Sequence, residues 1–407
     1  MQIDVYPMRA DGDLDIVSGR ISWEDSDKPV REIYAAAPSG IFVNPRTAHW
    51  LLLSVINFAI REHERRIKVL GDVDPALLRG LRYIQLQHGI WYGDGSIEID
   101  APLRSAYSYG PEQRRTAVFF SGGVDSFATI VRNRQDFPSG HPMAIDDGIL
   151  VDWFAPPSSD DLHGSLAHPH ARRVNSLQTL ENELGIRVVP VITNARRVAR
   201  YDFYYNWMFR DQGANLSSIA HLLSGRIGRA FIASTYNLPT LAPLGSHPLT
   251  DPWYSSADLQ IAHDSPDYSR LTKLRLLANR PAILAVLDVC SYWFQRTENH
   301  QLNCGKCEKC LRTQAGLAAL GVDGTRITTF EPVDLLSAIN GLGDFDDAYA
   351  RECWAELIGP LADRGHHSLA IAVRGLVTRS RVRNPVLDKD PGSGPGRRQA
   401  ADAGGVL

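Results

Sequence analysis

The sequence lacks any strong bias in charge or hydropathy. Its 407 residues include 43 Lys and Arg against 46 Asp and Glu, so no global basic field points to a nucleic-acid partner. No apolar run reaches the roughly 18 residues that a membrane helix needs. The N-terminal stretch MQIDVYPMRADGDLDIV also lacks the basic-then-apolar order of a secretory signal. We therefore expect a cytoplasmic protein that makes no membrane contact.

Cysteine is scarce as well, with five in the chain. An odd count is not typical of a disulfide framework. Three of the five, Cys304, Cys307 and Cys310, fall within seven residues, while Cys290 and Cys353 stand apart. This spacing indicates a metal cluster with one thiol to spare.

Two common nucleotide signatures are missing. The sequence contains no GxxxxGK[ST] phosphate loop. It contains no dinucleotide fingerprint either, because the Gly392-Ser393-Gly394 stretch lies in the C-terminal tail with no strand before it. Any nucleotide site must therefore use another loop.

What the chain does contain, from about residue 114, is an alternation of apolar strands and amphipathic helices. Such alternation predicts an α/β fold with a parallel sheet covered on both faces. The predicted strands are residues 117–120, 149–154, 188–193 and 229–234, and the predicted helices are 126–133, 171–184, 216–223, 270–288 with a break at Pro281, and 311–320.

Four regions follow from this pattern. We predict an α+β domain of unknown role over residues 1–112, with helices at 48–60 and after Asp74, and an α/β domain with the cysteine site over 113–325. A helical extension over 326–383 follows. The tail 384–407 is rich in Pro, Gly and Arg and is predicted to be disordered.

The segment AVFFSGGVDSFATIV carries the strongest chemical signal. A buried strand ends at Phe120, glycines follow, and a helix begins near Ser126. Glycine lets the backbone approach a ligand, and N–H groups at a helix start attract an anion. Ser121 and Ser126 add hydroxyl donors. Asp125 is an acid among anion-binding groups, so we expect it to cap the helix or to meet Mg²⁺.

An ordinary strand-to-helix turn is the alternative for this loop, since Asp-Ser is a common helix start. The position after the first buried strand of an α/β unit favours a nucleotide instead. Asp152, at the end of the second predicted strand, is a candidate for the nucleotide's ribose or adenine edge. A buried structural aspartate is the equal alternative there.

The cysteine segment reads Cys304-Gly-Lys-Cys307-Glu-Lys-Cys310-Leu-Arg. Tetrahedral zinc takes four ligands, and two intervening residues let a turn aim both sulfurs at one ion. Cys290 is the first candidate for the fourth ligand, His300 the second and Cys353 the third. Unliganded thiols and an iron–sulfur cluster are the alternatives. Four thiolates would close the site, so we expect a structural zinc.

The loop SGGVDS resembles the SGGxDS signature of the PP-loop ATP pyrophosphatases. Together with the CxxCxxC-Leu-Arg segment, it makes residues 114–325 similar to 7-cyano-7-deazaguanine synthase, of queuosine-type deazapurine biosynthesis. This resemblance implies a Rossmann-like adenine nucleotide alpha hydrolase fold. It also implies an ATP-dependent ligase that adenylates a small carboxylate, after which ammonia or an amine displaces AMP to form an amide or nitrile.

The resemblance also implies roles for individual residues. Lys273, in Arg270-Leu-Thr-Lys273-Leu-Arg275, is expected to contact ATP phosphates. The expected catalytic residues are Asp125, Lys273 and Ser126, the expected ATP-binding residues are Ser121, Gly122, Gly123, Val124, Asp125, Ser126 and Asp152, and the expected zinc ligands are Cys290, Cys304, Cys307 and Cys310.

This sequence departs from the family pattern in three ways. The interval from Cys290 to Cys304 is longer, an N-terminal region precedes the loop, and a helical region follows the cysteines. The identity of the carboxylate and of the nucleophile is therefore open. Two other functions remain as alternatives: modification of a tRNA base, and nucleotide binding without turnover. Whether the chain forms a homodimer is open too.

Overall fold

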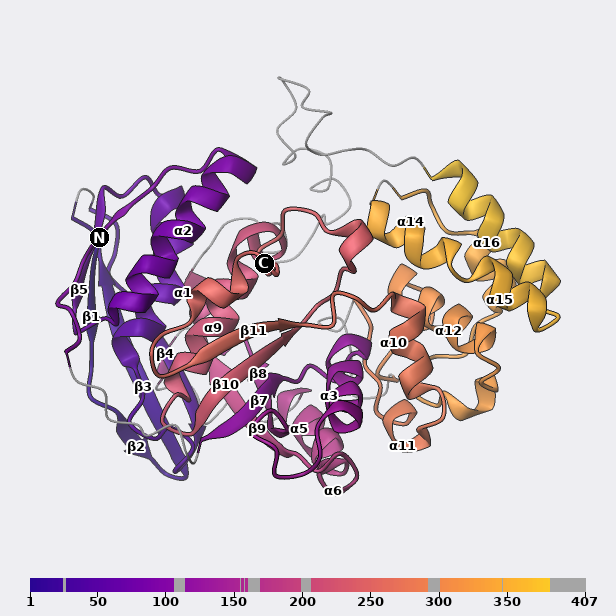
Figure 1. The fold of residues 1–407 in the computed structure, drawn as a ribbon, viewed down its shortest axis with the longest axis horizontal. Helices are drawn as coiled ribbons and strands as arrows, with labels where there is room; N and C mark the ends of the chain where they lie inside the picture. The colour runs from indigo at the N-terminus through magenta and orange to yellow at the C-terminus, as the bar shows by residue number, and fades with distance from the viewer. Residues whose placement is uncertain are drawn as a thin grey trace. The chain divides into compact units, whose positions relative to one another are not determined.

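The computed structural model describes residues 1–24, 27–105, 114–153, 155–156, 158–159, 169–198, 206–291, 301–345 and 347–380. It forms two compact units, Met1–Val289 and Cys290–Leu407 (Figure 1). The first unit is a mixed α/β structure built on one large, mostly parallel sheet, and the second is helical. In the part of the chain described, no helix is both long and apolar enough to cross a bilayer. The predicted tail lies outside the described residues.

Five parallel strands form one half of the sheet, in the order β11-β10-β7-β8-β9. They are β7 (Arg115–Phe119), β8 (Ile145–Asp152), β9 (Arg187–Thr193), β10 (Ile227–Ala233) and β11 (Gln260–Asp264). The prediction of a parallel sheet is confirmed for this half. Read from β9, the strands follow the chain order 3-2-1-4-5, which is a doubly wound arrangement.

The helices of this half are α3 (Val124–Asp136), α5 (Pro169–Gln178), α6 (Glu181–Leu184), α7 (Ala195–Val198), α9 (Gln212–Leu222), α10 (Arg270–Leu277) and α11 (Pro281–Leu284). The single helix predicted over 171–184 is in fact two, α5 and α6. Thr179 Oγ1 donates to the Ser176 carbonyl at 2.7 Å, a local bond that competes with the helical ladder where α5 ends. The predicted break at Pro281 is confirmed.

Short helices join these elements: the π-helix η3 (Trp207–Asp211) and the 3₁₀ helices η4 (Leu238–Thr240) and η5 (Asp251–Tyr254). The π-helix runs directly into α9.

The N-terminal region extends the same sheet rather than forming a separate domain. Its strands are β1 (Gln2–Val5), β2 (Arg9–Asp11), β3 (Leu14–Ser22), β4 (Arg31–Pro38), β5 (Arg66–Leu70) and β6 (Glu98–Asp100). Strand β4 pairs antiparallel with β9, and the side chain of Asn194 accepts from the Tyr34 N–H at 2.9 Å. The structure therefore differs from the predicted boundary at 112/113, because β9 would otherwise end the sheet as an unpaired edge.

Helices α1 (Thr47–Arg61) and α2 (Pro75–Tyr92) confirm the two N-terminal helices expected from the sequence. Asp74 caps α2 by accepting from the Ala76 N–H at 2.7 Å. Helix α1 packs against α9 across a buried histidine pair, with His49 Nδ1 3.2 Å from His221 Nδ1.

The hydrogen bonds of this histidine pair define both tautomers. His49 Nε2 accepts from the Asp74 N–H at 3.0 Å, and His221 Nε2 lies 2.9 Å from the Tyr254 carbonyl, which can only accept. Both rings are therefore neutral, with His49 protonated on Nδ1 and His221 on Nε2. Burial lowers the pKa of His221 to about 4 and lowers that of His49 well below its ordinary value.

The second unit contains α12 (Glu308–Ala319), η7 (Gly324–Arg326), α13 (Leu335–Asn340), α14 (Ala348–Ala355), α15 (Ile358–Asp363) and α16 (His367–Arg379). Its helical character agrees with the prediction. Trp354 on α14 is fully buried, and its Nε1 donates to Glu308 on α12 at 2.9 Å. The helices after residue 326 therefore share a core with the cysteine-bearing helix, which differs from the predicted division at 325.

Candidate functional site

The loop after β7 is a tight glycine turn that packs against Leu177. Gly122 has φ +74°, a left-handed conformation that favours glycine, and a Cβ there would lie 3.3 Å from Leu177 Cδ2. Gly123 is the N-cap of α3 and has an extended backbone. The strand, turn and helix predicted around this loop are thus confirmed, while its role in binding a nucleotide stays a prediction.

The topology puts this loop at a special position of the sheet. From β7 the chain continues to β8 on one side, whereas β10 flanks β7 on the other. In open α/β sheets, ligands bind at the carboxyl ends of the strands where the order reverses in this way. The loop 121–126 begins at the carboxyl end of β7, and Ser234 immediately follows β10.

Asp125 in the first turn of α3 faces two cations. Its Oδ2 lies 3.0 Å from Arg270 Nη1, and its Oδ1 lies 3.1 Å from Lys273 Nζ. Burial opposes ionisation, but the two charges and their hydrogen bonds outweigh it and lower the pKa of Asp125 below its ordinary value. This cation pairing is neither of the roles expected from the sequence, and Mg²⁺ binding by Asp125 stays a prediction.

Lys273 is held rigidly beside the loop. Its side chain is 1% exposed, and Nζ donates both to Asp125 and to the carbonyl of Ser234. Arg270, one turn earlier on α10, is 8% exposed. Two buried cations therefore face the Asp125 carboxylate beside the start of α3. Arg270 lies three residues before Lys273 in the same sequence motif, but the sequence pattern predicts no role for it.

Two more residues fix the loop by its carbonyl groups. Arg173 donates to the Ser121 carbonyl, and the Asp288 N–H donates to the Gly122 carbonyl at 2.9 Å. The Asp288 carboxylate lies 3.6 Å from the Arg173 guanidinium. Because C=O and N–H point in opposite directions across a trans peptide, the N–H groups of Gly122 and Gly123 face away from these partners.

Sequence reasoning missed both Arg173 and Asp288. Arg173 lies 52 positions from Ser121, and no spacing or motif connects it to the loop. Only the fold brings the start of α5 and the segment after α11 to the same turn.

The remaining predicted residues have different surroundings. Ser126 is buried, and its hydroxyl donates to the Gly123 carbonyl at 3.1 Å, so it helps to shape the turn. Ser121 is exposed, with its hydroxyl 3.4 Å from that of Ser126. Val124 is 1% exposed, so only its backbone can face a ligand. Asp152 is the last residue of β8, at the same edge of the sheet as the loop.

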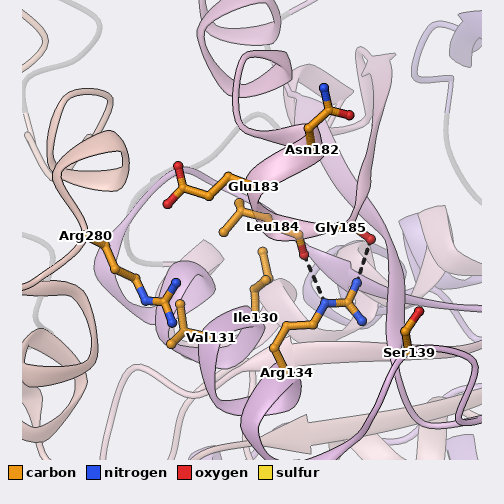
Figure 2. Close-up of a pocket in the computed structure, with 9 residues that line it drawn as sticks. All are labelled: Ile130, Val131, Arg134, Ser139, Asn182, Glu183, Leu184, Gly185 and Arg280. Carbon is orange, nitrogen blue, oxygen red and sulfur yellow. Dashed lines mark hydrogen bonds between the residues drawn. The ribbon is translucent and has the colours of Figure 1, made fainter.

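A pocket of about 300 Å³ lies at the other end of α3 (Figure 2). Its lining includes Ile130, Val131 and Arg280, and Arg134 donates to the carbonyls of Leu184 at 3.0 Å and Gly185 at 2.6 Å. None of the predicted site residues lines this pocket. Its wall is formed by groups that join α3 to α6, so it does not locate the nucleotide site.

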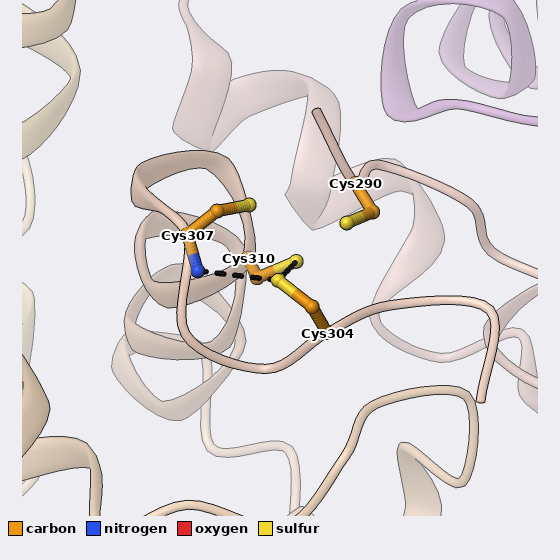
Figure 3. Close-up of side chains that lie close together, drawn as sticks. All are labelled: Cys290, Cys304, Cys307 and Cys310. Carbon is orange, nitrogen blue, oxygen red and sulfur yellow. Dashed lines mark hydrogen bonds between the residues drawn. The ribbon is translucent and has the colours of Figure 1, made fainter. Parts of the chain in front are cut away.

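The four predicted zinc ligands meet in the second unit (Figure 3). The sulfurs of Cys290, Cys304, Cys307 and Cys310 all lie within 4.8 Å of one another. Cys304 and Cys310 sulfurs are 3.9 Å apart. That separation is far from the roughly 2.05 Å of a disulfide and close to the ~3.8 Å expected between sulfurs each ~2.3 Å from one tetrahedral zinc.

Of the three candidates for the fourth metal ligand, the structure favours Cys290. Cys290 belongs to the four-sulfur group, and Cys353 is buried outside it. His300 lies outside the described residues. The residues present thus fit a metal such as zinc, which they would bind through four thiolates.

Backbone groups around the four cysteines hold the sulfurs in position. The Cys307 N–H donates to the Cys304 sulfur at 3.3 Å, an amide–sulfur bond that stabilises a thiolate. Gly305 has φ +71°, and a Cβ there would lie 2.3 Å from the Glu331 carbonyl oxygen, so the turn requires glycine. The hydrogen bond from the Cys310 thiol lowers the pKa of Cys307 to about 4.

Comparison with protein-family models, with curated proteins and with solved structures finds no match for this chain. The structure itself supports a mixed α/β fold and a four-cysteine cluster. Membership of the PP-loop family rests on the sequence resemblance and is a matter for proposal.

Proposed function

We propose that this chain is an ATP-dependent ligase-like enzyme of the PP-loop class. Its substrates would be a small carboxylate and ammonia or an amine. The observation that carries the proposal is the cluster of Lys273, Arg270 and Asp125 against the glycine turn, at the point where the sheet reverses its strand order. Two buried cations beside the start of a helix favour a polyanion at this position.

The loop residues would hold the phosphates. The N–H groups of Gly122 and Gly123 face away from the groups that bind the loop carbonyls, and the start of α3 adds the positive end of its dipole. The Gly123 N–H donates to the Ser121 hydroxyl at 3.3 Å, a bond that a phosphate oxygen would replace. Ser121 offers an exposed hydroxyl. Lys273 and Arg270 would balance the negative charge of the phosphates and keep them aligned, the two effects on which such reactions mainly depend.

When bound, ATP supplies the leaving groups: a carboxylate oxygen joins the α-phosphorus as pyrophosphate departs, and an amine then replaces AMP at the acyl carbon with loss of one proton. Ammonia as the nucleophile gives an amide, and removal of one further water gives a nitrile. The chain's own contribution is to orient the phosphates and stabilise the charge that develops on them.

Four cysteines would bind zinc and leave no coordination position for water or substrate. A closed site of this kind supports folding rather than the chemical step. We therefore assign zinc a structural role in the proposed enzyme, and Mg²⁺ the role of accompanying the phosphates.

The test is to incubate the purified protein with ATP, Mg²⁺ and a panel of heteroaromatic carboxylic acids, and to measure AMP and pyrophosphate for each acid. One acid should release both products. If 7-carboxy-7-deazaguanine releases none while another acid does, the substrate changes but the class stands. Products that need tRNA would favour the tRNA-modifying alternative, and nucleotide binding without products would favour the non-turnover one.

Asp125→Ala should abolish AMP formation, because Lys273 and Arg270 lose the carboxylate that positions them. Asp136→Ala is the matched control, since Asp136 ends the same helix and is 51% exposed. Circular dichroism of both variants would establish that they fold. Wild-type turnover in a folded Asp125→Ala variant would defeat the site assignment.

A further inference from the structure

The segment 286–290 links the phosphate loop to the cysteine cluster along the chain. Asp288 holds the Gly122 carbonyl through its N–H at 2.9 Å, and its carboxylate lies beside Arg173, which holds the Ser121 carbonyl. Two residues later comes Cys290, a member of the four-sulfur group. One short stretch of backbone therefore belongs to both sites.

The contact at Asp288 is a close backbone packing as well as a hydrogen bond. The Asp288 carbonyl oxygen lies 3.4 Å from the position that a Cβ on Gly123 would take. The Asp288 side chain is 6% exposed, so it is enclosed at this point. A shift of this backbone would therefore disturb both Gly122 and Gly123, the residues whose N–H groups the proposed function uses.

We infer that metal binding at the four cysteines controls the shape of the phosphate loop through Asp288. The chain spans at most about 3.3–3.6 Å per residue, so a metal that fixes Cys290 confines Asp288 to a small volume. When the metal leaves, Cys290 loses this restraint and the bond from Asp288 to the Gly122 carbonyl weakens. The loop then samples conformations in which the Gly122 carbonyl is no longer held by Asp288.

This inference rests on the proposed role of the loop in nucleotide binding. It extends that role by making Asp288 and Arg173 positioning residues and the metal a regulator of affinity. Coupling between two binding sites is reciprocal, so the nucleotide must also tighten the metal by the same factor. Couplings of this kind typically amount to ~5- to 150-fold in affinity, and we expect about tenfold here.

The experiment compares zinc-loaded and zinc-free protein. The probe is α,β-methylene-ATP, which cannot be cleaved between its inner phosphates, and its Kd is measured by calorimetry. Hydrogen exchange of the amides of Gly122, Gly123 and Val124 is measured in parallel without nucleotide. Zinc removal should raise the Kd about tenfold and accelerate exchange of these amides.

An insertion variant separates this coupling from general unfolding. Two glycines between Val289 and Cys290 leave all four cysteines in place but break the short connection to Asp288. This variant should still bind one zinc, and its loop amides should exchange fast even when zinc is bound. Two glycines between Gly140 and His141, in an exposed turn, form the matched control and should behave like the wild type.

The two proposals fail in different ways. If zinc-loaded wild-type protein binds no nucleotide, the proposed function fails, while the exchange measurement still tests the coupling. If nucleotide binds and its Kd changes less than twofold on zinc removal, the coupling is overturned and the proposed function stands. Wild-type loop exchange in the zinc-loaded Val289 insertion variant would also overturn it.

Discussion

The loop of residues 121–126 and the cysteine cluster are built in opposite ways. The cluster draws its four sulfurs from one segment that ends at Cys310, three of them within seven residues. The loop is short in sequence, yet its conformation depends on Arg173, Lys273 and Asp288, which come from distant parts of the chain. A site whose residues are close together in the chain can be recognised from their spacing in the sequence. A site whose residues come from distant parts of the chain becomes visible only in the folded structure.

The difference also concerns stability. The cluster gathers thiols that repel one another once ionised, so a metal bound to them would stabilise it. In the loop, the carbonyls of Ser121 and Gly122 and the carboxylate of Asp125 already have protein partners. We therefore expect substitutions in the cysteine cluster to lower the free energy of unfolding, and substitutions in the loop to lower the affinity for a ligand.

The largest expected effect is the loss of a metal ligand. Cys307→Ser should abolish zinc binding and destabilise the second unit by several kcal/mol, because metal-binding free energy is folding free energy in such sites. Zinc content and thermal unfolding would be measured. Cys353→Ala, at a buried cysteine outside the cluster, should cost about 1 kcal/mol and keep the zinc. Equal zinc content in both variants would contradict the assignment of ligands.

A smaller effect is expected where a buried cation is removed beside the loop. Lys273→Met should cost about 2–3 kcal/mol, less than for a fully buried pair because Asp125 is 21% exposed. Arg132 on α3 forms an ion pair with Asp267, which is 47% exposed. Arg132→Met breaks this pair and should lower the free energy of unfolding by under about 1 kcal/mol. Urea unfolding measures both. Equal costs would show that the Lys273 pair is an ordinary surface contact.

Substitutions at two glycines of similar conformation distinguish the effect of backbone strain from an effect on ligand binding. Gly122 has φ +74° and Gly140 has φ +84°, so alanine at either position should cost about 1–2 kcal/mol. A Cβ on Gly140 meets no atom within 4 Å. Only Gly122→Ala should weaken binding of α,β-methylene-ATP, measured by calorimetry. Comparable weakening in both variants would mean that the loop is not the binding surface.

The smallest effect is expected from acid on the first unit. The pKa of His221 is lowered from about 6.5 in the unfolded chain to about 4 in the folded chain. Between these pH values the unfolded chain binds a proton at this ring and the folded chain does not, so acid favours unfolding. The stability is therefore present above about pH 6.5 and is lost as the pH falls toward 4. His221 alone should account for about 1 kcal/mol between pH 7 and pH 5.5, and His49 acts in the same direction. Urea unfolding that is unchanged across this range would refute the neutral pair.

Local signals in the sequence predicted much of this molecule. The apolar run before Ser121 and the glycines after it predicted β7, the turn and α3. Asp74 before a proline predicted the start of α2, and the cysteine spacing predicted the group of Cys304, Cys307 and Cys310, with Cys290 as the first of three candidates for the fourth ligand. Each of these features depends on residues close together in the chain.

The rest could not be predicted because it depends on long-range packing. Nothing in residues 31–38 indicates that β4 will pair with β9, since an edge strand and an inner strand share the same apolar pattern. Arg173 and Asp288 resemble ordinary surface charges in the sequence.

The pairing of β4 with β9 has a consequence for synthesis on the ribosome. Tyr34 and Thr193, which are hydrogen-bonded across this junction, are separated by 159 positions. At about 5–20 residues per second, β4 emerges roughly 10–30 s before its partner exists. During that interval one side of β4 presents unpaired N–H and C=O groups, an open strand edge of the kind that can pair with other chains.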